Sequence, residues 1–218
     1  PLVTERTDTS SLALADTLSF AQDSVLLTVG ARRQTIKDTS YDYNTGVQTA
    51  TYDQSRTTPM AGVVFKATKD ISLFANYIEG LVKGDTANGA GITNAGQIFA
   101  PYVSRQKEIG AKYDGGSYGA TASLFSISKP SAYVQNNVFG VFGEQRNQGL
   151  ELSTYGEPIK GLRLLGGLTL LKAEQVNTFG GLTNGNDAIG VPRHQFNLGA
   201  DWDVPGVRGL ALNARVIN

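Results

Sequence analysis

Side chains that could perform chemistry are few in this sequence. His194 is the only histidine, and cysteine is absent from the 218 residues. A histidine-rich or thiolate metal site is therefore excluded, and a Ser-His-Asp triad would need His194 as its base. His194 lies in the stretch 191–196, at the start of a predicted strand, where a structural or hydrogen-bonding role fits better than catalysis.

Carboxylates and glycine-rich stretches do not supply a reaction centre either. Asp201 and Asp203 share one face of a predicted strand, but they flank a turn and are expected to be solvated, so they give a glycosidase little support. The glycine-rich stretch 84–96 stands between two strands with no helix to receive a phosphate, and we interpret it as a mobile loop. We expect no enzyme activity, no metal and no cofactor.

The composition predicts strands and turns. The chain has 26 glycines, one Met and one Trp, and 40% of its residues are hydrophobic. Its 19 basic and 19 acidic side chains balance, which gives no indication of nucleic-acid binding or of a polybasic membrane patch. The first residues show no secretory signal, so we expect the chain to begin downstream of one. No apolar run is long enough for a transmembrane helix.

Ten segments have strand character, and each is long for a soluble sheet. They are 10–20, 24–37, 52–67, 71–81, 102–113, 117–129, 143–155, 162–174, 191–204 and 209–218. Short turns alternate with long connections at about 38–51, 82–101, 130–142 and 175–190. That order predicts an all-β, antiparallel, up-and-down transmembrane β-barrel, of which about ten strands are present.

Alternating side chains support a lipid-facing side on several strands. Phe196, Leu198 and Trp202 alternate with polar residues, as expected when one face meets lipid and the other meets water. Two segments resist this assignment, because 162–171 is apolar on both faces and Asp16 interrupts the apolar face of its strand. Aromatic residues near the short turns predict an interfacial girdle. They are Phe20, Phe65, Tyr113, Tyr118 and Trp202.

Two other architectures compete with the barrel. The turns recur every forty-odd residues, but each period holds two strands and one large loop without a repeated signature, which argues against a propeller or solenoid. A soluble, lectin-like sandwich stays open as the alternative, because its apolar faces would meet each other instead of lipid. An outer-membrane enzyme is a third class, and the sequence offers it no evident nucleophile and base.

The chain resembles the barrel domain of TonB-dependent siderophore receptors of Gram-negative outer membranes. The similarity extends over about residues 10–218, and the order and spacing of its motifs are typical of the siderophore branch. The matching stretches are 72–80, 101–114, 123–130, the hairpin 143–171 and 191–202. Such receptors also have an amino-terminal plug, a TonB box and a terminal aromatic strand. We expect residues 1–218 to be part of the barrel domain, with the plug and the carboxy-terminal strands lying outside them.

This resemblance implies a function for the parent protein. It would be a monomeric receptor in the Gram-negative outer membrane, in contact with outer-membrane lipid, that imports a ferric siderophore with energy delivered through TonB. Iron would arrive already chelated, and aromatic and basic side chains suit such a bulky ligand. The alternative role for each candidate is packing within a loop or girdle. The candidate ligand-binding residues in or beside the long loops are Tyr41, Tyr43, Phe99, Tyr102, Phe139, Phe142 and Arg146.

Overall fold

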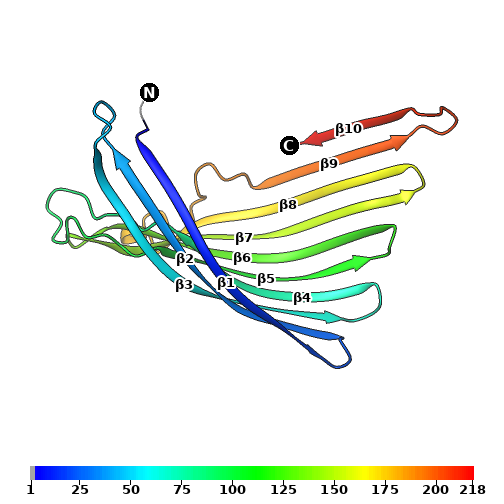
Figure 1. Cartoon of the computed structure of the whole chain (residues 1–218), viewed down its shortest axis with the longest axis horizontal. Helices are drawn as coiled ribbons and strands as arrows, with labels where there is room; N and C mark the ends of the chain where they lie inside the picture. Colours follow the sequence, from blue (N-terminus) through cyan, green and yellow to red (C-terminus); the bar gives the residue numbers. More distant parts are fainter. Residues whose placement is uncertain (1–2) are drawn as a thin grey trace.

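A computed structural model describes residues 3–218 as one antiparallel sheet in which each strand pairs with its sequence neighbours (Figure 1). The strands are β1 (Glu5–Phe20), β2 (Val25–Tyr41), β3 (Gln48–Lys66), β4 (Ile71–Val82), β5 (Tyr102–Asp114), β6 (Tyr118–Gln135), β7 (Val138–Ile159), β8 (Leu162–Val176), β9 (His194–Asp203) and β10 (Ala211–Ile217). The short 3-10 turn η1 (Phe179–Gly181) lies between β8 and β9. All ten predicted strands are therefore present, in the predicted meander.

Two of the predicted long loops are wrong. The segments 38–51 and 130–142 are mostly strand, because β2 and β3 extend to a turn at 42–47 and β6 and β7 extend to Asn136-Asn137. Both of these asparagines have positive φ, at 50° and 61°, which is the backbone conformation of a two-residue type I′ hairpin turn. Residues 38–41 are polar, and the second hairpin contains Pro130, Gly140 and Gly143. Both stretches therefore resemble loop sequence, although their ladders continue.

The strand register collects the apolar side chains on one continuous face. Directly opposed residues share a face, so the register carries the assignment from strand to strand. We call this apolar face the outer belt. It comprises Leu12, Leu14, Leu18, Phe20, Val25, Leu27, Val29, Ala61, Val63, Phe65, Ile71, Leu73, Ala75, Ile109, Ala111, Tyr113, Tyr118, Ala122, Leu124, Leu150, Leu152, Leu164, Leu168, Leu170, Phe196, Leu198, Trp202, Leu212 and Val216.

A row of polar side chains ends the outer belt on the side of the large loops. On β2 the belt extends from Val25 to Arg33, and on β4 from Ile71 to Glu79. The eight steps between these residues extend about 26 Å at ~3.3 Å per residue, close to the ~25 Å apolar band of outer-membrane barrels. All five predicted girdle aromatics lie on this face, beside the short turns. The boundary row consists of Arg33, Thr57, Glu79, Lys107, Ser126, Gln148, Lys172 and His194.

The register also orients the two segments that the sequence leaves ambiguous. In β8, Leu168 opposes Leu152 and Phe196, so the even-numbered residues of this strand join the outer belt and the odd-numbered ones face the other way. Asp16 opposes Val29 and therefore lies on the belt itself. It is the one charged exception within the apolar face.

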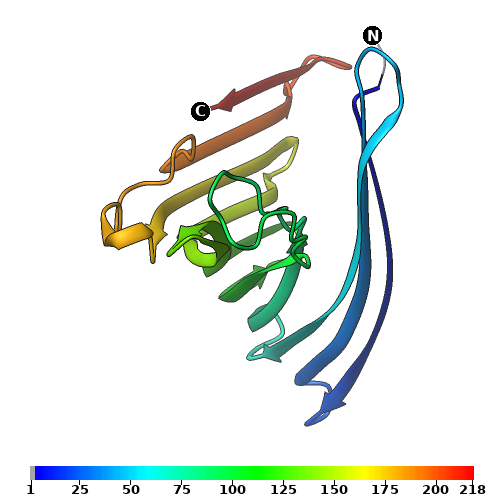
Figure 2. The same cartoon turned by 90° about the vertical axis from the view of Figure 1, so that its left-hand side faces the viewer.

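The opposite face is mixed, with polar side chains among apolar ones such as Phe74, Phe125 and Leu165, and the sheet is a single curved layer (Figure 2). Its polar side chains include Arg32, Asn76, Glu108, Gln145, Asn147, Glu151, Arg163, Asn197 and Asp201. No second layer covers the outer belt in residues 3–218, and Phe196 and Trp202 are 39% and 41% exposed. The sandwich alternative is therefore rejected, because it requires these side chains to be sealed between two sheets. No helix in the described part of the chain has the length and apolarity to span a membrane.

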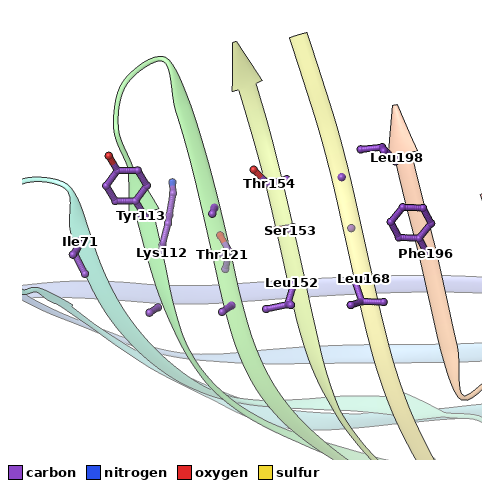
Figure 3. Close-up of a pocket in the computed structure, with 15 residues that line it drawn as sticks. Ile71, Lys112, Tyr113, Thr121, Leu152, Ser153, Thr154, Leu168, Phe196 and Leu198 are labelled. Atoms are coloured by element: carbon purple, nitrogen blue, oxygen red, sulfur yellow. The ribbon is translucent and has the colours of Figure 1, made fainter. Parts of the chain in front are cut away.

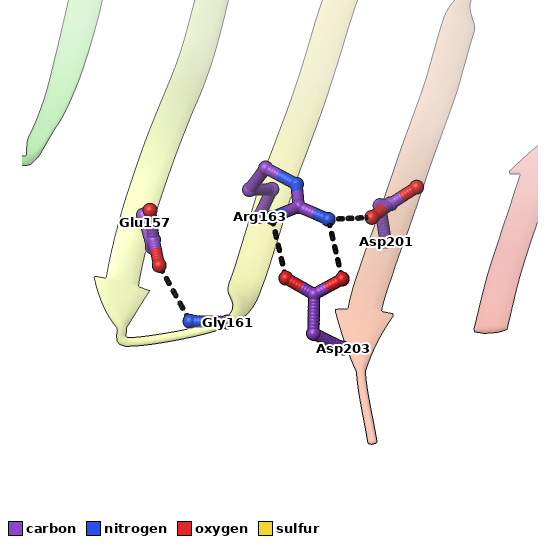
Figure 4. Close-up of polar contacts among 5 residues, drawn as sticks. All are labelled: Glu157, Gly161, Arg163, Asp201 and Asp203. Carbon is purple, nitrogen blue, oxygen red and sulfur yellow. Dashed lines mark hydrogen bonds and ion pairs between the residues drawn. The ribbon is translucent and has the colours of Figure 1, made fainter. Parts of the chain in front are cut away.

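On the inner face, an arginine links two strands beside the short turns (Figure 4). Arg163 on β8 donates through Nη1 to Asp203 Oδ2 at 2.8 Å and through Nη2 to Asp203 Oδ1 at 3.1 Å. It also pairs with Asp201, and the Glu157 carboxylate accepts from the amide of Gly161 in the adjacent turn. The two carboxylates that sequence reasoning considered as a reaction pair thus hold β8 to β9.

Candidate functional site

The large connection between β4 and β5, residues 83–101, folds over the inner face at the large-loop end (Figures 1 and 2). We call it the β4–β5 loop. At its start, the ammonium group of Lys83 pairs with Asp38 on β2, whose side chain is only 2% exposed. Asp38 also accepts from the Thr7 hydroxyl at 3.1 Å. The pKa of Lys83 is raised, chiefly because its ammonium group donates to the Asp38 carboxylate.

Two tyrosine hydroxyls hold the next residues of this loop. The Gly84 amide donates to the Tyr52 hydroxyl at 3.1 Å, and the Tyr102 hydroxyl donates to Asp85 Oδ2 at 3.2 Å. The Lys83 ammonium also lies 5.8 Å from the centroid of the Tyr52 ring, within the range of a cation–π contact. At the other end of the loop, Arg56 donates to the Pro101 carbonyl at 3.1 Å. These contacts fasten both ends of the loop to β3 and β5.

The middle of the loop is held by the β6–β7 hairpin. Asn94 makes two hydrogen bonds to the backbone of Phe139: its Nδ2 donates to the carbonyl at 2.8 Å, and its Oδ1 accepts from the amide at 2.9 Å. The Thr93 amide donates to the Asn137 carbonyl at 2.7 Å. A β-bridge joins Thr86 to Ile98 within the loop. The stretch 84–96, which the sequence predicts to be a mobile loop, is therefore hydrogen-bonded to the β6–β7 hairpin.

Replacing Asn94 with Ala should release this loop from the hairpin. Both bonds to Phe139 would be lost, and two hydrogen bonds together contribute about 1–3 kcal/mol. We expect the amides of Thr93 and Phe139 to exchange with solvent at least about fivefold faster in the whole receptor. Replacing the exposed Asn44 with Ala, at the tip of the β2–β3 hairpin, is the matched control. Unchanged exchange at Phe139 would show that Asn94 does not hold the loop.

The structure brings four of the seven candidate residues into two aromatic clusters. Phe99 lies 6.4 Å from Tyr102 and 5.6 Å from Phe139, between ring centroids, and both pairs are edge-on. Phe142 lies 5.6 Å from Tyr133, which in turn lies 6.1 Å from Phe179. We call these groups the Phe99 cluster and the Tyr133 cluster.

The remaining candidates are separate from both clusters. Tyr41 and Tyr43 lie at the tip of the β2–β3 hairpin, where Tyr43 is 58% exposed. Beside them, the pKa of Asp42 is lowered because its carboxylate accepts from the amide and hydroxyl of Thr45. Arg146 pairs with Glu144 at 2.9 Å and shares the face of the outer belt, beyond its polar boundary.

Several residues of this end were not predicted from the sequence. Asp38 and Lys83 are separated by 45 positions, and only the fold of the loop shows that they pair. Tyr133 and Phe179 join Phe142 because β6, β7 and the β8–β9 connection meet at this end. Aromatic residues beside long connections are a signal that would have included both of them, while Tyr52 lay in a predicted strand and carried no such signal.

The chemistry available in the described residues is stacking, hydrogen bonding and charge contact. Within residues 3–218, no three His, Cys, Asp or Glu side chains are grouped so that they could hold a metal ion. Residues 115–119 match the Gly-x-Ser-x-Gly pattern of a nucleophile elbow, but they form the hairpin turn between β5 and β6 and the first two residues of β6, instead of a strand-to-helix turn.

A groove of about 570 Å³ crosses the outer belt over β4–β9 (Figure 3). Small residues, including Ala111, Ala122 and Gly166, form its floor, and Tyr113 and Phe196 stand beside it. Because it lies on the apolar face, it is on the side opposite the inner polar residues and the β4–β5 loop. It is a feature of the belt surface and not part of the binding end.

A single-layer antiparallel meander with an apolar outer belt, polar side chains on its inner face and large connections at one end is the wall of a membrane β-barrel. Residues 2–216 match the family described as TonB dependent receptor-like, beta-barrel. The chain belongs to this family, whose members are transport receptors. The sheet it forms is an open part of such a barrel, with β1 and β10 at its edges.

Individual relatives are siderophore receptors. The chain is 40% identical over 223 residues to the ferrichrome receptor FcuA of Yersinia enterocolitica. The aligned region covers 100% of this chain and 29% of FcuA. The solved structure of BauA, the ferric preacinetobactin receptor of Acinetobacter baumannii, has a TM-score of 0.82 at 46% identity, over 98% of this chain and 32% of BauA. The siderophore receptor PiuA of the same species, at 21% identity and a TM-score of 0.76, shares the fold. The chain thus spans about a third of the length of these relatives.

Proposed function

We propose that this chain forms part of the barrel wall of an outer-membrane receptor that binds a ferric siderophore and imports it with energy delivered through TonB. The polar side chains of the inner face and the β4–β5 loop support this proposal, because in a closed barrel they would line a hydrophilic passage and place aromatic rings at its large-loop end. The plug and the remaining strands would lie outside this segment. The receptor would work as a monomer, with iron entering as a chelate and no resident cofactor.

The relatives suggest which ligands to test first. FcuA is named for ferrichrome and BauA for ferric preacinetobactin, so these two complexes are the natural first probes. Uptake of radioactive iron from either complex should require the whole receptor and should be lost in a host that lacks TonB. Uptake that continues without TonB would contradict the proposal.

We assign the candidate side chains two different roles. Tyr102 is only 8% exposed and its hydroxyl bonds to Asp85, so it would position the β4–β5 loop. Phe142 is 39% exposed and Phe179 is 57% exposed, so the Tyr133 cluster offers ring surface for stacking against a ligand. Arg146, already paired with Glu144 and directed to the outer side, is the weakest of the candidates.

Replacing Phe142 with Ala should lower the affinity of the whole receptor for its ferric siderophore by about three- to tenfold, because one aromatic contact contributes ~0.5–1.5 kcal/mol. Tyr102→Ala should also weaken binding, through loss of loop order. Tyr102→Phe removes only the hydroxyl and should have the smaller effect. The control is Phe65→Ala, at the girdle end of the belt. Titration with the ferric complex measures all four variants, and unchanged affinity in Phe142→Ala and Tyr102→Ala would reject both roles.

A further inference from the structure

Two asparagines of the chain are followed directly by glycine, and both lie in large connections at the same end of the sheet. Asn88-Gly89 is in the β4–β5 loop, and Asn184-Gly185 is in the connection between β8 and β9. All four residues are exposed. In such a pair the glycine has no side chain that would hinder its backbone nitrogen from approaching the preceding side-chain carbonyl carbon. The side-chain amide of the asparagine is therefore open to attack from its own backbone.

The two sites differ in their hydrogen bonds and not in their exposure. The Asn184 side-chain oxygen accepts from the Thr178 amide at 2.8 Å and from the Thr178 hydroxyl at 3.0 Å. The Gly185 amide donates to the Gln175 carbonyl at 2.9 Å. At this site, the side chain that would be attacked and the nitrogen that would attack it are both held in place.

The site at Asn88 has neither restraint. Among the described residues, no hydrogen bond joins the Asn88 side chain or the Gly89 amide to another protein group. The loop is fixed just before this site, because the Ala87 amide donates to the Gln97 carbonyl at 2.8 Å. A Cβ placed on Gly89 would meet no atom closer than a methyl group of Ile92 at 3.8 Å. The reacting groups are therefore solvated and unhindered, on a loop that is itself ordered.

We propose that Asn88 is a site of spontaneous deamidation, which converts a neutral residue of the β4–β5 loop into a carboxylate. The Gly89 amide nitrogen loses its proton and bonds to the side-chain carbonyl carbon of Asn88, and the bond from that carbon to the side-chain nitrogen breaks. Ammonia leaves, and a succinimide ring remains. Water then opens the ring at either carbonyl and gives aspartate or isoaspartate. The reaction consumes one water, releases one ammonia and needs no other reactant.

The modification adds a negative charge at the large-loop end without removing a contact that holds the loop. The bonds of Asn94 to Phe139 and the ion pair of Lys83 with Asp38 do not involve Asn88. Isoaspartate also lengthens the backbone by one carbon at this point. The inference depends on the path of the β4–β5 loop and not on the proposed transport function.

The test follows deamidation of the whole receptor in detergent during incubation in mildly alkaline heavy-oxygen water. Ring opening takes its oxygen from this water, so product formed during the incubation is distinguished from product that was already present. Digestion with trypsin in ordinary water then releases the two sites in the separate peptides 84–105 and 173–193, since each follows a lysine and ends in an arginine. Fragment mass spectra assign the label to individual asparagines.

In the folded receptor, label should appear at Asn88 at least about fivefold faster than at Asn184, because reaction at Asn184 requires its hydrogen bonds to open first. In concentrated urea the two sites should react at similar rates, since both are followed by glycine. Thr178→Val removes the hydroxyl that binds the Asn184 side chain and should speed reaction there about twofold or more. Equal rates at the two sites of the folded receptor would overturn the inference. Label at both sites in urea, with none at Asn88 in the folded receptor, would also overturn it.

Two variants of Asn88 complete the test. Asn88→Gln should leave position 88 without label, because attack on the longer side chain would have to form a larger ring. Asn88→Asp carries the charge of the product. Hydrogen exchange of its Thr93 and Phe139 amides should match wild type, and faster exchange would contradict the inference that modification leaves the loop fastened.

Discussion

Replacing Leu152 with Arg should destabilise the folded whole receptor in a bilayer by about 2–4 kcal/mol, the range measured for arginine at the midplane of a barrel's lipid face. Leu152 opposes Ala122 and Leu168 in the register and lies at the middle of the outer belt. The guanidinium would have to leave water for hydrocarbon without a partner. Urea titration of the receptor folded into phospholipid vesicles measures the change.

The adjacent residue supplies the control for this prediction. Ser153 precedes Thr154 on the same strand and points to the inner face, where it opposes Thr121 and Gly167. Ser153→Arg places the same charge in a polar environment and should cost much less than Leu152→Arg. Equal destabilisation by the two variants would show that the two faces do not differ as the register implies, and the barrel interpretation would fail.

Replacing Lys83 with Met should open the start of the β4–β5 loop. Asp38, whose side chain is 2% exposed, would keep its charge and lose its cation, which costs about 2–4 kcal/mol when a partly buried pair is broken from one side. We expect the amides of Gly84 and Ala87 to exchange at least about thirtyfold faster. Hydrogen exchange of the whole receptor measures this, and Lys69→Met in a short turn is the matched control.

A double replacement separates the charge from the fold of the loop. Lys83→Met combined with Asp38→Asn removes both charges, so part of the protection should return. The pKa of Lys83 is raised in the folded protein. The stabilisation that its charged form gives to the loop is therefore fully present at neutral pH and is lost only as the pH rises above the ordinary lysine range. If exchange at Gly84 is the same in the single and double variants, the pair is not what holds the loop.

Much of the fold was predictable from local sequence. Alternation in 195–204 indicated the lipid side of β9, and short turns such as 114–116 separated the strands correctly. The ends of β2, β3, β6 and β7 were not predictable. Residues 38–41 are polar on both faces, and the β6–β7 hairpin contains Pro130, Gly140 and Gly143, which are typical of loops. Cross-strand hydrogen bonds extend these strands, and the pattern of side chains in the sequence gives no indication of those bonds.

The binding end was predicted in part. Phe99, Tyr102, Phe139 and Phe142 were predicted because aromatics beside long connections suit a bulky ligand, and the structure places them in two aromatic clusters at the large-loop end. Whether they contact a siderophore stays a prediction. The roles of Asp38 and Asn94 depended on the path of the β4–β5 loop, which no spacing in the sequence specifies.

By itself, the sequence determined that this protein is a meander of long antiparallel strands with one lipid-facing side, because a side-chain period of two is a local property of extended backbone. The tertiary structure decided which face of β8 is outward, where Asp16 lies and how the β4–β5 loop is fastened. Those features depend on register and on contacts between residues far apart in the chain. A shift of one residue in register reverses every face, and only the completed ladder excludes it.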